Sequence, residues 1–309
     1  MRRVLNLQGH RGARGLFPEN TLAGFAAALA VGVDSFELDV AVTADGVPVV
    51  SHDAALNPDI ARGRDGAWLS GRGPLIRTLT FDELAAFDVG RLWPGSAYAA
   101  QFPDQVPHDG ARVPTLADVL RVDPEVHFNI EMKTYPDHPD WTVVPATMAE
   151  LVIATIEAAG MTGRVSVESF DWRGPRHIRR RRPDLPLAWL TSPQTEAAAS
   201  LWWDGPTPGD YAGSVPRAVA AEGGSIWAPH HAALTEAQIN EAHGLGLTVL
   251  PWTVNDAAEM RRLLRAGADG LITDRPDIAR GVLAQEGFPL PPVRQPGLWR
   301  RVTLPQGPR

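Results

Sequence analysis

Two carboxylates stand two residues apart in the apolar run 35–40, which reads Ser-Phe-Glu-Leu-Asp-Val and contains Glu37 and Asp39. In a β-strand, side chains at positions i and i+2 point to the same side, so the two acids would converge while the apolar side chains face away. On its own, such a pair more often marks a half-buried strand with an acidic solvent face. With further oxygen ligands nearby, it would form half of a site for a hard divalent cation.

A third acid, Glu131, is followed two residues later by Lys133 and repeats this spacing on another predicted strand. Three carboxylates, in a chain without cysteine and without a His-x-His motif, suit Ca²⁺ or Mg²⁺ better than Zn²⁺. Glu37, Asp39 and Glu131 with the cations Arg11 and Lys133 carry a formal charge of −1, which a divalent ion changes to +1. Only the site that holds the ion is therefore expected to attract an anion.

Two histidines follow predicted strands and could transfer protons. His10 comes directly after the first strand, and His52 follows a short apolar run that returns beside the second. Since imidazole titrates near neutral pH, one histidine could act as a base while the other protonates a leaving group. A single histidine at a strand end is more often structural, so the prediction depends on both lying near the same acids.

The elements that must position these side chains recur as a helix, a glycine and a strand. Residues 26–40, 153–168, 239–252 and 260–274 each show an amphipathic run, then a glycine, then a β-branched or apolar run. Eight strands are expected, at 4–9, 35–40, 126–132, 165–169, 187–190, 225–228, 247–252 and 270–273. Eight such units, with no Gly-x-Gly-x-x-Gly after the first strand, favour a closed (β/α)8 TIM barrel of the α/β class over an open doubly wound sheet. A barrel of this kind builds its active site at the C-terminal ends of its strands, where the acids and histidines stand.

Helix starts agree with this division. Thr235 and Gln238 form a capping-box pattern, and Asn255 can cap the helix that follows it. Pro276 suits a first helical position, so we assign Asp274, just before it, to helix capping rather than to chemistry.

Two segments interrupt the alternation. Residues 54–113, rich in Gly, Pro and Arg with one helix expected from Thr80 through Phe87, are too long for an ordinary loop. They form either a small inserted subdomain after the second βα unit or a mobile lid. Residues 286–309 contain six prolines, which exclude a regular helix. We therefore expect a barrel domain at 1–285, with the insertion 54–113, and an irregular C-terminal tail.

Composition excludes several classes of function. The formal net charge of −7 argues against nonspecific nucleic-acid binding, and no run approaches the roughly 20 apolar residues that span a bilayer. The basic start Arg2-Arg3 is followed by too short and polar a run for a signal peptide, which favours a cytoplasmic location. The absence of cysteine leaves a periplasmic or secreted location open. A small molecule is the expected partner, and the sequence does not indicate the oligomeric state.

Eight motifs stand in the chain in a fixed order. They are His10-Arg11-Gly12, Pro18-Glu19-Asn20-Thr21, Glu37-Leu38-Asp39, His52-Asp53, Glu131-Met132-Lys133, Ser169-Phe170, Trp252-Thr253-Val254-Asn255 and Gly270-Leu271-Ile272-Thr273-Asp274. From residue 9 to about 280 the chain resembles the glycerophosphodiester phosphodiesterase family. The resemblance implies a (β/α)8 barrel with a small insertion after the second unit. It also implies metal-dependent hydrolysis of glycerophosphodiesters to sn-glycerol 3-phosphate and an alcohol, as part of lipid and glycerol metabolism.

The resemblance also implies roles for single residues. The divalent cation, Ca²⁺ or Mg²⁺, would be bound by Glu37, Asp39 and Glu131; the acid and base would be His10 and His52; the phosphate would be held by Arg11 and Lys133; and the cleft would be walled by Phe170 and Trp252. Glu19 and Asn20 would organise the loop or the surroundings of the metal, although Asn20 or Thr21 could instead cap the first helix. Which histidine is the acid stays open.

Two departures from the family pattern leave the substrate open. After His52-Asp53 the chain reads Ala-Ala-Leu-Asn-Pro-Asp-Ile at 54–60, where many members have an Arg-Thr-Thr-type segment, and a long loop surrounds Trp202-Trp203. One alternative is therefore a phosphodiesterase that acts on phospholipid headgroups at a membrane, for which the tryptophan pair is the candidate contact. The other is a catalytically silent protein that binds phosphodiesters.

Overall fold

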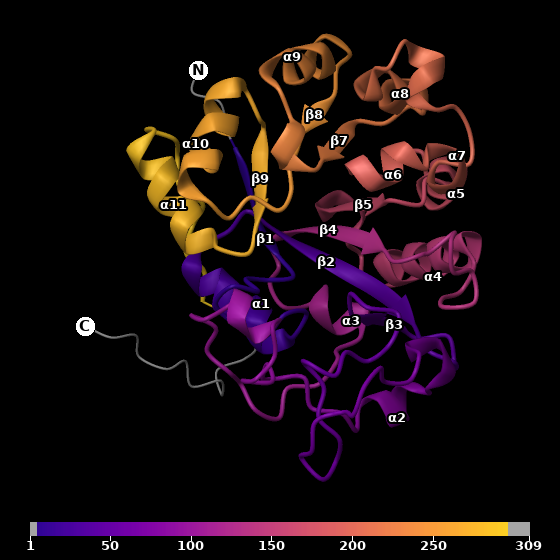
Figure 1. Cartoon of the computed structure of the whole chain (residues 1–309), viewed down its shortest axis with the longest axis vertical. Coiled ribbons are helices and arrows are strands. Elements are labelled where there is room, and N and C mark those ends of the chain that lie inside the picture. Colours follow the sequence, from indigo (N-terminus) through magenta and orange to yellow (C-terminus); the bar gives the residue numbers. More distant parts are fainter. Residues whose placement is uncertain (1–4, 296–309) are drawn as a thin grey trace.

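Eight parallel strands form the barrel in this computed structural model, which describes residues 5–295 (Figure 1). They are β1 (Asn6–His10), β2 (Ser35–Val42), β4 (His127–Met132), β5 (Val165–Ser169), β6 (Leu187–Thr191), β7 (Ile226–Pro229), β8 (Thr248–Val249) and β9 (Gly270–Thr273). Their order is β8-β7-β6-β5-β4-β2-β1-β9. Backbone hydrogen bonds from Asp269 N to Val249 O (3.0 Å) and from Ile272 N to Pro251 O (3.1 Å) join the two ends of this order. The predicted (β/α)8 barrel is confirmed.

Helices surround the strands. The longer ones are α1 (Leu22–Val31), α4 (Pro145–Ala158), α5 (Arg173–Arg181), α8 (Val215–Ala221), α9 (Glu236–Gly244), α10 (Ala257–Ala266) and α11 (Pro276–Gln285), with the short α6 (Pro193–Ala197) and α7 (Ala199–Trp202) in one connection. The capping box predicted at Thr235 is present at the start of α9. Asn255 does not cap α10: Asp256 does, because its side chain reaches the backbone N–H groups of the first turn.

Strand β2 shows how the barrel separates its core from its site. Phe36, Leu38 and Val40 are fully buried on the outer face, where Phe36 packs on Phe25 of α1 with ring centroids 5.0 Å apart. The alternation of side chains then directs Glu37 and Asp39 into the barrel. The acids are therefore buried by the same periodicity that builds the core.

The insertion 54–113 folds against the end of β2. Strand β3 (Pro48–Val50) pairs antiparallel with β2 and precedes the insertion. The insertion contains the short helices η1 (Ile76–Thr78), α2 (Phe81–Leu84) and η2 (Ala99–Gln101), and helix α3 (Leu116–Val119) follows the insertion. A separate cluster of buried apolar side chains joins the insertion to the barrel; its members are Ala41, Val49, Leu56, Ala61, Ile76, Leu84, Val89 and Val113. The expected helix from Thr80 is real but shorter than predicted, since it ends at Leu84.

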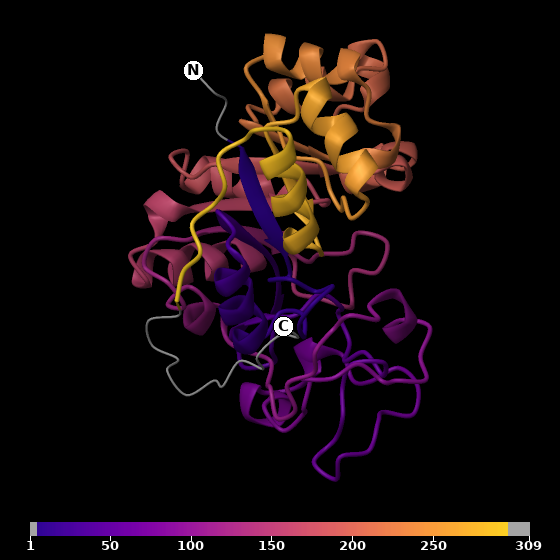
Figure 2. The same ribbon diagram turned by 90° about the vertical axis from the view of Figure 1, so that its left-hand side faces the viewer.

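After α11 the chain runs along the outside of the barrel beside α1 without forming a helix or strand up to residue 295 (Figure 2). Arg294 fixes this segment, because its backbone N–H donates to Leu29 O and its guanidinium to Val33 O, both at 2.9 Å. The rest of the predicted tail, 296–309, lies outside the described residues. Within 5–295, no helix is both long and apolar enough to cross a membrane.

Candidate active site

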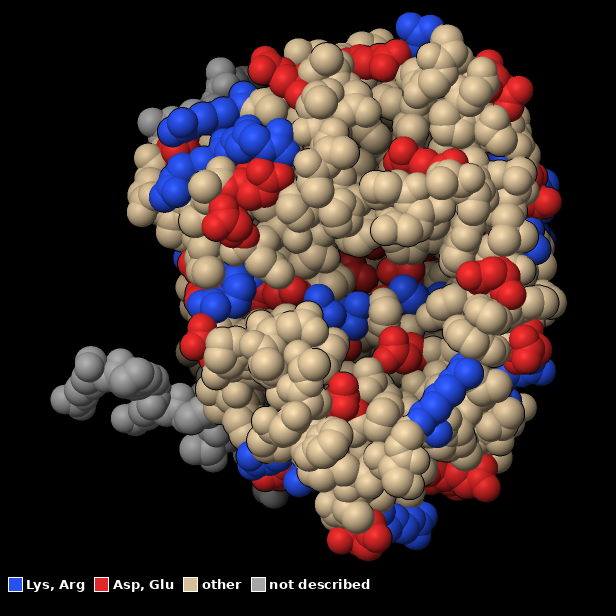
Figure 3. Space-filling view, viewed as in Figure 1, with Lys and Arg blue, Asp and Glu red and all other residues tan. Residues whose placement is uncertain are grey.

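A cavity of about 190 Å³ opens at the C-terminal ends of the strands and is lined by eight of the eleven predicted site residues, all except Glu19, Asn20 and Asp39. Its lining includes His10, Arg11, Glu37, His52, Glu131, Lys133, Glu168, Phe170 and Trp252. Figure 3 shows acidic and basic side chains inside a hollow at the middle of this face. The sequence therefore predicted most of the residues that line this cavity.

Three buried carboxylates meet in the cavity. Glu37 on β2, Glu131 on β4 and Glu168 on β5 each place one oxygen within 4.8 Å of the other two. The barrel register explains this, since Glu131 stands beside Glu168 in the pairing of β4 with β5. The sequence analysis missed Glu168, although the run Val165–Ser169 repeats the pattern of an acid set in an apolar strand.

Asp39 lies next to this group but not within it. Its Oδ2 accepts a hydrogen bond from Asn20 Nδ2 at 2.9 Å and lies 3.3 Å from Arg11 Nε. Its Oδ1 is buried without a hydrogen bond and lies 3.5 Å from Lys133 Nζ. The role of Asp39 as a metal ligand stays a prediction, and Oδ1 is the atom that could serve it.

Burial and mutual repulsion raise the pKa values of the three glutamates. Burial, with the negative charge of Glu131 beside it, raises the pKa of Glu168 to about 8, and burial raises that of Glu131 to about 7. Glu37 shifts in the same direction, by burial and the charge of Asp39. Burial opposes ionisation of Asp39 as well, but Arg11, His52 and Lys133 outweigh it and hold its pKa below the usual range. A set of buried oxygens that repel one another fits a hard divalent cation.

His10 is held by Asp274. Its Nδ1 lies 2.6 Å from Asp274 Oδ1, and Asp274 also accepts two hydrogen bonds from Arg14, both at 3.0 Å, and one from Asn255 Nδ2 at 2.8 Å. The opposite ring nitrogen, Nε2, lies 3.6 Å from Glu37 Oε2. Our assignment of Asp274 to helix capping was wrong, because its carboxylate points into the barrel and orients a histidine.

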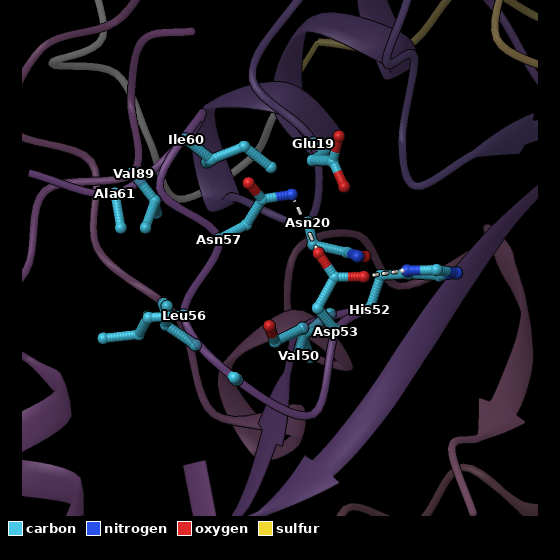
Figure 4. A pocket seen from close by; sticks show the side chains of 13 residues that line it. Glu19, Asn20, Val50, His52, Asp53, Leu56, Asn57, Ile60, Ala61 and Val89 are labelled. Carbon is cyan, nitrogen blue, oxygen red and sulfur yellow. Dashed lines mark hydrogen bonds and ion pairs between the residues drawn. The ribbon is translucent and has the colours of Figure 1, made fainter. Parts of the chain in front are cut away.

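His52 has a matching partner on the other side of the cavity. Its Nδ1 lies 2.7 Å from Asp53 Oδ1, and Asn57 Nδ2 donates to Asp53 Oδ2 at 2.9 Å (Figure 4). Burial, together with the charges of Arg11 and Lys133, lowers the pKa of His52 to about 4. Both histidines therefore have Nδ1 fixed by an aspartate, which leaves Nε2 for chemistry.

Arg11 and Lys133 are buried beside the acids. Lys133 Nζ donates to Glu131 Oε1 at 2.7 Å, and Arg11 Nη1 donates to Glu19 Oε1 at 2.7 Å. Glu19 in turn accepts a hydrogen bond from the Tyr98 hydroxyl. Glu19 thus holds Arg11 as Asn20 holds Asp39, while the N-cap of α1 is Thr21.

Aromatic side chains form one wall. Phe170 and Trp252 meet edge to face with centroids 5.2 Å apart, and the Lys133 ammonium lies 6.0 Å from the Phe170 centroid. Trp203 is fully buried and stacks on Trp172 with centroids 4.0 Å apart. Trp203 is therefore not part of an exposed apolar rim, and Trp202 is half-buried and meets Phe170 edge to face with centroids 6.5 Å apart.

Comparisons with known proteins agree with this geometry. The model of the glycerophosphoryl diester phosphodiesterase family matches residues 10–278. A glycerophosphodiester phosphodiesterase of Bacillus subtilis (strain 168) is 28% identical over 284 residues, which cover 89% of this chain and 85% of that protein. A Silicibacter pomeroyi DSS-3 crystal structure, assigned to the glycerophosphoryl diester phosphodiesterases, is 38% identical with a TM-score of 0.84, covering 93% of this chain and 96% of that one. An Oleispira antarctica phosphodiesterase solved in complex with the product sn-glycerol-3-phosphate shares the fold, at 21% identity and a TM-score of 0.68, covering 91% of this chain and 97% of that one.

Proposed function

This chain belongs to the glycerophosphoryl diester phosphodiesterase family, and on that premise we propose that it hydrolyses glycerophosphodiesters to sn-glycerol 3-phosphate and an alcohol by histidine acid-base catalysis with a divalent cation. The observation that carries the proposal is the arrangement of His10 and His52. Each is fixed through Nδ1 by an aspartate, and both line a cavity that also contains buried carboxylates and the cations Arg11 and Lys133. The sn-glycerol-3-phosphate complex of the Oleispira relative supports the same product here.

The carboxylates fit the cation that such chemistry uses. Glu37, Glu131 and Glu168 would hold it, with Asp39 Oδ1 as a further oxygen. An all-oxygen set is typical of Ca²⁺ or Mg²⁺ sites. When bound, a divalent cation supplies positive charge that polarises the phosphoryl group.

Arg11 and Lys133 would neutralise the phosphate. Both are buried, so their charges act in a poorly solvated cavity, where charge stabilisation is stronger than in water. Their present partners are Glu19, Glu131 and Asp39, which keep the two cations at the cavity wall. A diester phosphate between them would receive charge-assisted hydrogen bonds from both.

The positions of the two histidines suggest which one acts as the base and which as the acid. His10 Nε2 lies on the side of Glu37, so we assign it to remove the proton of the nucleophile, either water or a hydroxyl of the glycerol. His52 lines both this cavity and the groove beside it, so we assign its Nε2 to protonate the leaving alkoxide. It would take up that proton when the bound phosphate offsets the charges of Arg11 and Lys133, which with burial lower its pKa. Asp274 and Asp53 would hold the two Nδ1 protons in place while Nε2 takes up or releases a proton.

The test is the release of sn-glycerol 3-phosphate from glycerophosphocholine, measured with a coupled dehydrogenase. We expect hydrolysis that EDTA abolishes and Mg²⁺ or Ca²⁺ restores. His10→Asn and His52→Asn should each lower kcat about 100-fold or more, the usual scale for an acid or base.

The control variant is His243→Asn. His243 is exposed on helix α9, outside the cavity, and its ring pairs with Asp269. Hydrolysis that continues unchanged after exhaustive EDTA treatment would contradict the role of the cation. Near-normal turnover by either active-site variant would contradict the role of that histidine.

A further inference from the structure

A second cavity of about 540 Å³ opens beside the active site and shares His52 with it. Its other walls come from the insertion and from the connection between β4 and α4, and they include Leu56, Pro58, Arg72, Tyr135 and Trp141. We call this cavity the side groove. Since His52 stands at the junction, a molecule whose phosphate lies in the active site can extend into the groove on the far side of this histidine.

Arg72 is the charged group of this groove that has no partner of opposite charge. Its guanidinium carbon lies 4.2 Å from the ring centroid of Trp141, and Trp141 itself stacks on His138 at 3.8 Å. Within the described residues 5–295, no carboxylate lies at ion-pair distance from Arg72. By contrast, Arg62 and Arg91 of the same insertion both pair with Asp109. Stacking thus fixes a guanidinium whose N–H donors remain available.

The other polar groups of the groove are already engaged. Both oxygens of Asp53 accept hydrogen bonds, from His52 and from Asn57. The hydroxyl of Tyr135 donates to the backbone oxygen of His52 at 3.2 Å. Asp53 also lines the groove, with both oxygens engaged in this way, so the free guanidinium of Arg72 is the group that can bind an anionic part of a ligand. Its planar fork of N–H donors matches carboxylate and phosphate oxygens.

We propose that the side groove holds the alcohol part of the glycerophosphodiester, and that Arg72 makes the enzyme prefer alcohols that carry a second anionic group, a phosphate or a carboxylate. The inference rests on the proposed function, since it takes the position of the phosphate from the active site. The leaving oxygen then lies beside His52, and the rest of the alcohol extends along Tyr135 towards Trp141. The glycerol part remains on the side of the carboxylates.

The test compares two substrates that differ by one phosphate, glycerophosphoinositol 4-phosphate and glycerophosphoinositol. We expect the wild type to show a kcat/KM about fivefold to tenfold higher for the phosphorylated substrate, the scale of one partly exposed charge-assisted contact. Arg72→Gln should bring the ratio of the two values close to one. Arg64→Gln, which removes an exposed arginine of the same insertion outside the groove, should leave the ratio unchanged.

Binding measured without turnover separates this inference from the proposed function. Titration calorimetry on the slow His10→Asn protein with Mg²⁺ should show tighter binding of the phosphorylated ligand, and Arg72→Gln should remove that difference. Hydrolysis with a ratio that Arg72→Gln does not change would overturn the groove assignment and leave the proposed function intact. Failure of both ligands to bind would overturn it as well. A binding difference that depends on Arg72, together with a wild-type protein that hydrolyses neither ligand, would support the groove and refute the proposed function.

Discussion

Replacing Glu168 by Gln should change the affinity for metal and the stability of the metal-free protein in opposite directions. Glu168 is buried beside Glu37 and Glu131, and its Oε2 accepts a hydrogen bond from Asn129 Nδ2 at 2.7 Å. Glutamine keeps the size of the side chain and can still accept that hydrogen bond, but it removes one negative charge. The variant therefore tests charge with little change in packing.

The expected gain in stability follows from the pKa of Glu168. Because its folded-state pKa of about 8 lies above the ordinary glutamate value of 4.5, the folded chain binds more protons than the unfolded chain between these values, and stability falls as pH rises through this range. At pH 7.5 the corresponding cost has an upper bound of about 4 kcal/mol. The proton is shared among Glu37, Glu131 and Glu168, which titrate together, so removing Glu168 removes only part of this cost. We therefore expect the metal-free variant to be about 1–2 kcal/mol more stable than the wild type.

The expected loss in metal affinity is about 10- to 100-fold or more, because one of three converging carboxylates is gone. Calorimetric titration with Mg²⁺ and Ca²⁺ gives the affinity, and urea unfolding in EDTA at pH 7.5 gives the stability. Glu236→Gln, on an exposed helix turn, is the matched control for the charge change. A variant that binds metal as tightly as the wild type would refute the place of Glu168 in the site. Lower stability without metal would refute the repulsion.

Two further variants test how His52 is held and titrated. Asn57→Ala removes the 2.9 Å hydrogen bond to Asp53 and should lower kcat about tenfold with little change in KM; a loss confined to KM would contradict its role in positioning. Because the pKa of His52 is lowered to about 4, only the unfolded chain gains a proton there between pH 6.5 and 4, so stability falls with falling pH. Urea unfolding in EDTA at pH 7 and pH 5.5 should show a pH-dependent loss that is smaller in His52→Gln than in the wild type by at most about 1 kcal/mol, since the side chain is partly exposed. Equal losses in both proteins would contradict the lowered pKa.

The barrel could be predicted because its signals are local. A glycine after each amphipathic run marks the end of a helix, and the apolar run that follows must be a strand that the next helix covers. Strand β8 has two residues instead of the expected six, since its continuation past Val249 reaches Pro251, which has no N–H to donate. The insertion could be predicted only as a segment, because its short helices depend on a cluster of buried side chains from distant parts of the chain.

The site could be predicted where the spacing of two residues in a strand decided the direction of a side chain. Glu37 and Glu131 were found by that rule, and Glu168 obeys it too, but without a second acid or base in its strand. Asp274 was misassigned because the proline that follows gave it a sufficient local explanation. Its bonds to His10 and Arg14 join residues about 260 positions apart, which no local pattern indicates.

The fourth acid changes the balance of charge in the site. Glu37, Asp39, Glu131 and Glu168 face two cations, so the fully ionised site carries a formal charge of −2, and a divalent ion brings it to zero. A neutral site would attract an anionic diester less than the +1 expected from three acids. The raised pKa of Glu168 means that near pH 7 this carboxyl is largely protonated before the metal binds, so a bound ion would displace its proton, and metal affinity should rise with pH. Because Lys133 donates to Glu131, a bound ion would compete with it for that carboxylate and would leave Lys133 available to the phosphate, whereas Glu19 would still hold Arg11.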